Sequence, residues 1–447
     1  MEGTVNLTKG SIGGQLFRLS LPVIASYFMQ MFYSLTDIAW LGHYSNEAVA
    51  AVGTCGIITW IVESLSMLTN TGAEVTVGQS VGVSNSADAK KYIANNVTIA
   101  TVISLFCTVI VFALSKQIVN LFLLETDIAS LSNSFLRIVS LAFPFYFIST
   151  AFVGSFNGAG NTRVPLYIFG GGFVLNMLLD PLFIYGFNMG SDGAAVATLL
   201  SKVIVCLTFV YVVKIRKVLF NGLKIFTRID RKKAGIIFRI GTSVALLNAV
   251  YAFINMLLGR IASVNGGYIA LLSFTTGSKL ESLTWYTALG LSAALCAFVA
   301  QNYAAGEYKR MASAYKRSIL VTIAIGLVGT IGFIFFGREL FSLFVPDREA
   351  YMSGAEYLRI SGYSQILMMV EITSQGVFYG FGRTLPPAVI SVTFNVLRIP
   401  LALFMASTSL GVLGIWWAIA ATSIIKGLIL LVWTIVILRE KANRNER

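Results

Sequence analysis

An amide and an acidic side chain lie one helical turn apart in the apolar segment 164–187. Asn176 and Asp180 are four positions apart, so they share one face of a helix. Pro181 follows directly, and because proline has no N–H, the carbonyl of Met177 loses its helical donor or the helix bends. Carboxylate, amide and carbonyl oxygens suit a hard cation, and a buried carboxyl group can also hold a proton. Asp180 is therefore the first candidate for an ion-binding residue.

Three further polar side chains are expected at a similar depth, if each helical residue rises about 1.5 Å. One is Asp37 in the first apolar segment. The other two, Thr198 and Lys202, lie one helical turn apart in the sixth segment. Two interpretations stay open. Either Asp37, Asn176, Asp180 and Thr198 form a proton or sodium site, or Asp180 and Lys202 form a structural ion pair while Asp37 reaches the headgroups. In the first case we expect Lys202 to point away from the acids, toward a carbonyl or a cavity, because its charge would repel a cation.

Other polar side chains in apolar segments are candidates for a substrate cavity. Thr150 and Asn157 stand in the fourth segment, and Glu281 and Glu371 stand in the second half of the chain. Charged groups inside a membrane pair with one another or face a cavity. For both glutamates a structural pairing is favoured, and the buried bases available to them are Lys279, Arg398 and Lys426.

The chain contains an internal duplication. The pattern Gly-x-Gly-x-Thr-x-x-Pro at 158–165 recurs at 380–387. Residues 175–182 match 394–401, so that asparagine and proline are kept, whereas Asp180 is replaced by Ile399. Internal repeats in hydrophobic chains are typical of transporters. The candidate ion site therefore belongs to the first half alone.

Composition places the chain in the membrane. It is 56% hydrophobic and 12% charged, with a mean hydropathy of +0.78, which excludes an ordinary soluble domain. We predict an all-α fold of twelve transmembrane helices in two pseudo-symmetric six-helix bundles. The bundles would be residues 1–214 and 236–447, joined by a basic cytoplasmic linker at 215–235. The predicted spans are 15–40, 48–80, 92–114, 135–159, 164–187, 193–214, 236–262, 267–303, 316–336, 352–381, 386–407 and 411–438.

Basic residues are distributed unequally between the two sides of this topology. Most of the 33 Lys and Arg lie in the N-terminal arm, alternate loops and the C-terminal tail. The positive-inside rule then predicts a multi-pass inner (plasma) membrane protein with both termini cytoplasmic. This distribution explains the net charge of +13 without nucleic acid, which we do not expect as a partner. The four cysteines lie within spans and indicate neither a disulfide nor a metal site.

These motifs together resemble the multidrug and toxic compound extrusion (MATE) family. The run Val-Ala-Gln-Asn-Tyr-Ala-Ala-Gly at 299–306 is also similar to that family. The resemblance covers about residues 10–438 and is nearest to the bacterial branch with its cation site in the N-terminal lobe. It implies that Asp37, Asn176, Asp180 and Thr198 bind a proton or a sodium ion. It further implies a conformational role for Pro22, to which we add Pro181 from its place in the helix. Lys202 is not explained by the family pattern.

The resemblance implies secondary antiport by a protein that is not an enzyme and has no cofactor. A proton or sodium ion would drive export of amphipathic, often cationic drugs, and the expected partners are small organic cations and membrane lipids. A monomer is expected. Two alternatives stay open: a lipid or lipid-linked oligosaccharide flippase of the same superfamily and, less favoured, an intramembrane enzyme. The sole histidine, His43, belongs to no His-Glu-x-x-His motif, which argues against the enzyme.

Overall fold

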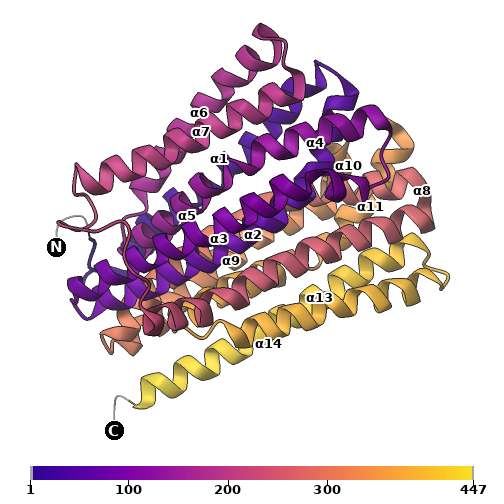
Figure 1. Cartoon of the computed structure of the whole chain (residues 1–447). Coiled ribbons are helices and arrows are strands. Elements are labelled where there is room, and N and C mark those ends of the chain that lie inside the picture. Colours follow the sequence, from indigo (N-terminus) through magenta and orange to yellow (C-terminus); the bar gives the residue numbers. More distant parts are fainter. Residues whose placement is uncertain (1–3, 445–447) are drawn as a thin grey trace. The chain divides into compact units, whose positions relative to one another are not determined.

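The computed structural model describes residues 4–444, and this part of the chain is built from helices and loops without a strand (Figure 1). The first half contains α1 (Ile12–Gly42), α2 (Asn46–Gly82), α3 (Ser86–Asn120), α4 (Thr126–Ser140), α5 (Phe143–Gly158), α6 (Arg163–Pro181), the π-helix η1 (Leu182–Gly186) and α7 (Gly190–Lys214). The second half contains α8 (Arg231–Ala304), α9 (Tyr308–Phe335), α10 (Gly337–Ser342), α11 (Arg348–Gly362), α12 (Gln365–Gly380), α13 (Leu385–Ala406) and α14 (Val412–Arg444).

The long helix α8 is in fact two helices. Its backbone breaks at Gly266 and at Gly267, whose φ of 65° and ψ of −156° suit glycine alone. Eight described helices are long and apolar enough to span a membrane, and α4 with α5, bent by 48°, makes a ninth. When α8 is counted as two, α11 with α12 as one, and the six-residue α10 is left out, the described chain has six segments on either side of the loop at 215–230. The predicted all-α architecture is confirmed.

The chain forms two compact units, each with its own core. Leu21–Leu246 and the residues up to Lys9 form the N-terminal unit, and Gly10–Ser20 with the chain from Leu247 onward forms the C-terminal unit. In the N-terminal core, Phe152 of α5 stacks on Phe209 of α7 with ring centroids 5.9 Å apart. In the C-terminal core, Trp416 lies parallel to Phe274 at 5.8 Å. The division into bundles at 1–214 and 236–447 with a basic cytoplasmic linker at 215–235 stays a prediction.

Two glycines allow α5 to lie directly against the backbone of α2. A Cβ atom added to Gly154 would lie 2.0 Å from the carbonyl oxygen of Asn70, and one added to Gly158 would lie 2.3 Å from that of Glu74. These distances are far inside van der Waals contact. Small residues that bring backbones together are typical of helix contacts in membranes. The position of α5 on α2 therefore depends on the absence of two side chains.

The second half repeats this contact between α12 and the later part of α8. A Cβ on Gly376 would lie 2.3 Å from the carbonyl oxygen of Ser292, and one on Gly380 would lie 2.9 Å from that of Cys296. Gly158 and Gly380 are the matched first glycines of the duplicated motif. The internal duplication therefore extends from sequence to helix packing.

The beginning of α8 belongs to the N-terminal unit. Asp230 Oδ1 accepts the backbone N–H groups of Lys232 and Lys233 and so caps the helix. The buried Ile237 lies in one cluster with Leu68 of α2 and Ile99 of α3. A matching segment, Gly10–Ser20 at the beginning of α1, lies in the C-terminal unit. There Arg310 of α9 donates to the carbonyl of Gly10 and to Gln15 Oε1.

Candidate functional site

Asp180 and Asn176 lie fully buried in the last turns of α6. Asn176 Nδ2 donates to Asp180 Oδ1 over 3.1 Å, as expected for side chains one turn apart. The second carboxylate oxygen of Asp180 and the amide oxygen of Asn176 are buried without a hydrogen-bond partner. Because a buried acceptor without a donor is costly, two such oxygens on one helical face fit a positively charged ligand.

Asp37 of α1 supplies a second carboxyl group to this place. Its Oδ1 is also buried without a hydrogen-bond partner. The carboxyl groups of Asp37 and Asp180 interact electrostatically and lie close enough for a direct side-chain hydrogen bond. Two adjacent carboxylates repel each other unless a proton or a cation lies between them. The pair therefore joins α1 to α6 only when it is partly neutralised.

Thr198 of α7 is connected to these acids through a tyrosine. Tyr33 Oη donates to Thr198 Oγ1 over 3.1 Å, and Tyr33 interacts electrostatically with both Asp37 and Asp180. The sequence analysis did not identify Tyr33. The available signal was its spacing of one helical turn before Asp37, which places both on one face of α1. The structure thus brings the four predicted site residues into one neighbourhood, with Tyr33 as a fifth member.

Pro181 ends the regular part of α6. It cannot donate to the helix, and the chain continues as the π-helix η1, closed by Phe187 N–H to the carbonyl of Leu182 at 3.0 Å. Pro22 lies inside α1, where Ser26 Oγ donates to its carbonyl oxygen. The two helices that carry Asp37 and Asp180, α1 and α6, therefore each contain a proline that removes a backbone hydrogen bond.

Lys202 does not pair with Asp180, so that interpretation is wrong. Its Nζ lies 2.9 Å from Glu63 Oε1 of α2 and 4.3 Å from the centre of the Tyr146 ring. The expected carbonyl partner is also wrong, because a carboxylate holds the lysine. The ammonium group does lie against Tyr146, which lines the pocket described next. Lys202 is nevertheless close enough to interact electrostatically with Asp37. The ion pair with Glu63 therefore holds a positive charge near Asp37 without a direct contact to Asp37 or Asp180.

A pocket inside the N-terminal unit contains two of the predicted cavity residues. Thr150 and Asn157 of α5 line it, together with Glu74 of α2. The amide oxygen of Asn157 is buried without a hydrogen-bond partner. Aromatic and polar side chains from α1, α5 and α6 complete the walls, among them Tyr27, Gln30, Tyr146 and Phe169.

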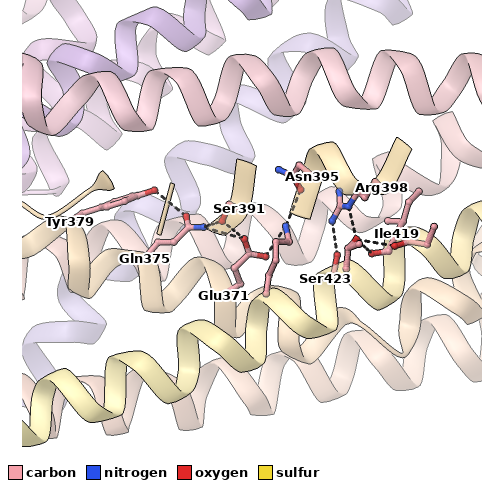
Figure 2. A network of polar contacts seen from close by, with 11 residues as sticks. Glu371, Gln375, Tyr379, Ser391, Asn395, Arg398, Ile419 and Ser423 are labelled. Atoms are coloured by element: carbon pink, nitrogen blue, oxygen red, sulfur yellow. Dashed lines mark hydrogen bonds and ion pairs between the residues drawn. The ribbon is translucent and has the colours of Figure 1, made fainter. Parts of the chain in front are cut away.

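The two predicted glutamates of the second half lie in the C-terminal unit. Glu371 of α12 pairs with Lys426 of α14 at 3.1 Å and accepts from Ser391 at 2.7 Å. Figure 2 shows Glu371 within a row of polar side chains on neighbouring helices. The favoured structural pairing of Glu371 is therefore confirmed. Glu281 interacts with the hydroxyl groups of Ser361 and Tyr357 and, electrostatically, with Arg398.

Comparison with known proteins gives consistent matches along the chain. The sequence model of the MatE family matches residues 22–182 and 240–404. A probable multidrug resistance protein NorM from Thermotoga maritima is 28% identical over 430 residues, which cover 92% of this chain and 90% of the relative. An FAD transporter from Shewanella oneidensis is 23% identical over 436 residues, which cover 96% and 95%.

A solved structure shows the same fold. It is described as the outward-facing conformation of a multidrug resistance MATE family transporter of the MOP superfamily. It matches with a TM-score of 0.92 at 20% identity and covers 99% of both chains. The two family matches fall one in each half of the duplicated sequence and together span most of the chain. The chain belongs to the MatE family of multi-pass membrane transporters.

Proposed function

We propose that this protein is a secondary antiporter that exports amphipathic, often cationic organic compounds, with Asp37, Asn176, Asp180 and Thr198 binding the coupling ion. The observation that supports this proposal most directly is that Asp37, Asn176 and Asp180 each have a buried oxygen without a hydrogen-bond partner. Two carboxylates, an amide and a hydroxyl offer an oxygen-only ligand set, which suits sodium, and the paired acids can equally hold one proton. The proposed location is the inner membrane, with both termini cytoplasmic.

Ion binding in this arrangement would change the contact between helices. Asp37 and Asp180 stand on α1 and α6, and each of these helices contains a proline. A proton or sodium ion between the acids removes their repulsion and holds α1 against α6, whereas the empty pair pushes the helices apart. A ligand drives a conformational change only by its different affinity for the two states. The ion would supply that difference, with Pro22 and Pro181 as points where the helices can bend.

The pocket that contains Asn157 and Thr150 is the proposed substrate region. It combines the carboxylate of Glu74 with the rings of Tyr27, Tyr146 and Phe169. A carboxylate and aromatic faces attract organic cations through charge and cation–π interactions. Relatives named as multidrug resistance or export proteins support this class of cargo.

The proposal predicts ion-driven efflux of a fluorescent organic cation from proteoliposomes. The purified protein is reconstituted, and sodium and proton gradients are imposed separately, so that each ion is tested without the other. Efflux driven by a pH gradient in sodium-free buffer identifies protons as the coupling ion, and efflux driven only by sodium identifies a sodium site. No efflux under either gradient would contradict the antiporter assignment.

One relative is named as an FAD transporter. An anionic dinucleotide is therefore the cargo to test against organic cations. Unlabelled FAD is therefore added in a parallel arm of the same assay. Under our proposal, an unlabelled organic cation inhibits efflux of the fluorescent cation and FAD does not. Inhibition by FAD and not by the organic cation would contradict the proposed substrate class and indicate a dinucleotide substrate.

The ion pair between Glu63 and Lys202 gives a further prediction. In Glu63→Gln protein the lysine loses its carboxylate and can turn toward Asp37, with which it already interacts. At about 6 Å and an effective dielectric constant of about 20, the ammonium–carboxylate attraction is about 3 kcal/mol. We expect the apparent affinity for the coupling ion to fall at least roughly tenfold, since tenfold is about 1.4 kcal/mol. The measurement is the ion concentration that gives half-maximal efflux.

The double variant Glu63→Gln/Lys202→Met is the control for this prediction. It removes the competing ammonium together with its partner, so the ion affinity should return toward the wild-type value. A double variant as impaired as the single variant would show that Glu63 acts by another route.

A further inference from the structure

The second half repeats part of the candidate cation site. Thr198 and Lys202 on α7 recur on α14 as Thr422 and Lys426, with the same spacing. α7 follows α6 as α14 follows α13, and Asn176 of α6 recurs as Asn395 of α13. Both acids are missing, because Ile399 stands where Asp180 stands in the first half, and the segment 236–262, which corresponds to the segment with Asp37, contains no acid. The C-terminal unit therefore keeps the amide and hydroxyl positions of the candidate ion site without its two carboxylates.

The ammonium group of Lys426 lies at this position of the C-terminal unit. Its Nζ is 3.1 Å from Asn395 Oδ1 and 3.1 Å from Glu371 Oε2. All three residues are buried, each no more than 4% exposed. In the first half, the equivalent amide oxygen, on Asn176, has no partner. The positive charge is thus held by an amide and a carboxylate, the oxygen types that the first half offers to an ion.

The surrounding charges oppose a free cation at this position. Figure 2 shows Arg398 next to Asn395 in the same row. Arg398 donates to Thr422 Oγ1 at 2.9 Å and to Ser423 Oγ at 2.8 Å, and it interacts electrostatically with Glu281. The guanidinium adds a second fixed positive charge beside Lys426, so an additional cation would meet repulsion from both.

We propose that Lys426 acts as a covalently attached cation in a second, pseudo-symmetric ion site of the C-terminal unit. The wild-type unit therefore binds no exchangeable ion there. Removal of the ammonium group exposes Glu371 Oε2 and Asn395 Oδ1 and converts the place into a site for a small monovalent cation. The likeness to the first site rests on the proposed function, but the ligands of Lys426 are independent of it.

The test uses the full-length purified protein and Lys426→Ala, which leaves room for a free ion. All variants carry Asp180→Asn, so that the N-terminal site contributes nothing and failure of the proposed function does not affect the readout. Thermal unfolding is followed in choline, sodium and methylammonium chloride. We expect sodium or methylammonium to raise the unfolding temperature of the Lys426→Ala protein in a saturable way, because a ligand that binds only the folded state stabilises it. Saturable sodium-22 binding should appear in the same variant.

Two controls determine whether the response comes from the proposed ligands. Addition of Glu371→Gln should abolish both the ion-dependent shift and sodium-22 binding, and the parent with Lys426 intact should show neither. Lys426→Ser, which also removes the ammonium group and leaves room for an ion, covers the case in which the alanine variant is not recovered folded. Ion-dependent stabilisation that persists with Glu371→Gln overturns the proposal. So does the absence of any ion response in the folded Lys426→Ala variant or, if that variant is not recovered with any of the three salts, in Lys426→Ser.

Discussion

Asp180→Asn should reduce ion-driven efflux to the level of protein-free liposomes while leaving folded protein in the membrane. The amide keeps the size of the carboxyl group and its contact with Asn176, but it removes one of the two charges that face each other across α1 and α6. Without that charge the site can neither bind a proton nor hold a cation against Asp37. Asp37→Asn should have the same effect for the same reason. Efflux in proteoliposomes under the coupling gradient is the measurement.

Asp192→Asn is the matched control, because this acid lies in the first turn of α7 and bonds to Ser134. It should retain efflux close to that of the wild type. Near-normal efflux by well-expressed Asp180→Asn protein would remove Asp180 from the coupling site. Equal loss in all three variants would instead indicate a general sensitivity to the loss of membrane carboxylates.

Gly154→Ala should destabilise the N-terminal unit strongly. The added Cβ would lie 2.0 Å from the carbonyl oxygen of Asn70, a backbone atom that cannot rotate away. The helices α2 and α5 must separate, and overpacking of this kind costs about 1–3 kcal/mol, occasionally more. The loss should appear as a lower unfolding temperature in detergent and a smaller yield of monodisperse protein.

Two other glycines calibrate this result. A Cβ on Gly171 of α6 meets nothing within 4 Å, so Gly171→Ala should be close to neutral or slightly stabilising. Gly376→Ala places the same strain between α12 and α8 and should resemble Gly154→Ala. Unaltered stability of Gly154→Ala would show that α5 can shift on α2 without loss.

The sequence predicted the parts of the site that depend on one helix. Asn176 and Asp180 share a face because of helical periodicity, and their contact follows from that spacing alone. The break in α8 was also predictable, since the predicted spans 236–262 and 267–303 leave a short gap that contains Gly266. Local geometry determines both features, so no knowledge of packing was needed.

Contacts between helices were harder to predict. Lys202 stands one turn after Thr198, which suggested Asp180 as a partner, yet the structure pairs it with Glu63 on α2. Hydropathy does not determine how a helix is rotated about its axis, and that rotation decides which acid the lysine reaches. Tyr33 was missed for the same reason, because its role depends on where α1 faces α7.

A single-repeat ancestor of this protein could not have completed either unit from one copy. The first turns of α8 are built into the N-terminal unit, and the first turns of α1 are built into the C-terminal unit. Before the gene duplicated, each bundle would have taken its missing helical segment from a second subunit, so the ancestor would have been an obligate dimer with exchanged N-terminal segments. Fusion of the two copies would have turned an exchange between chains into one within a chain.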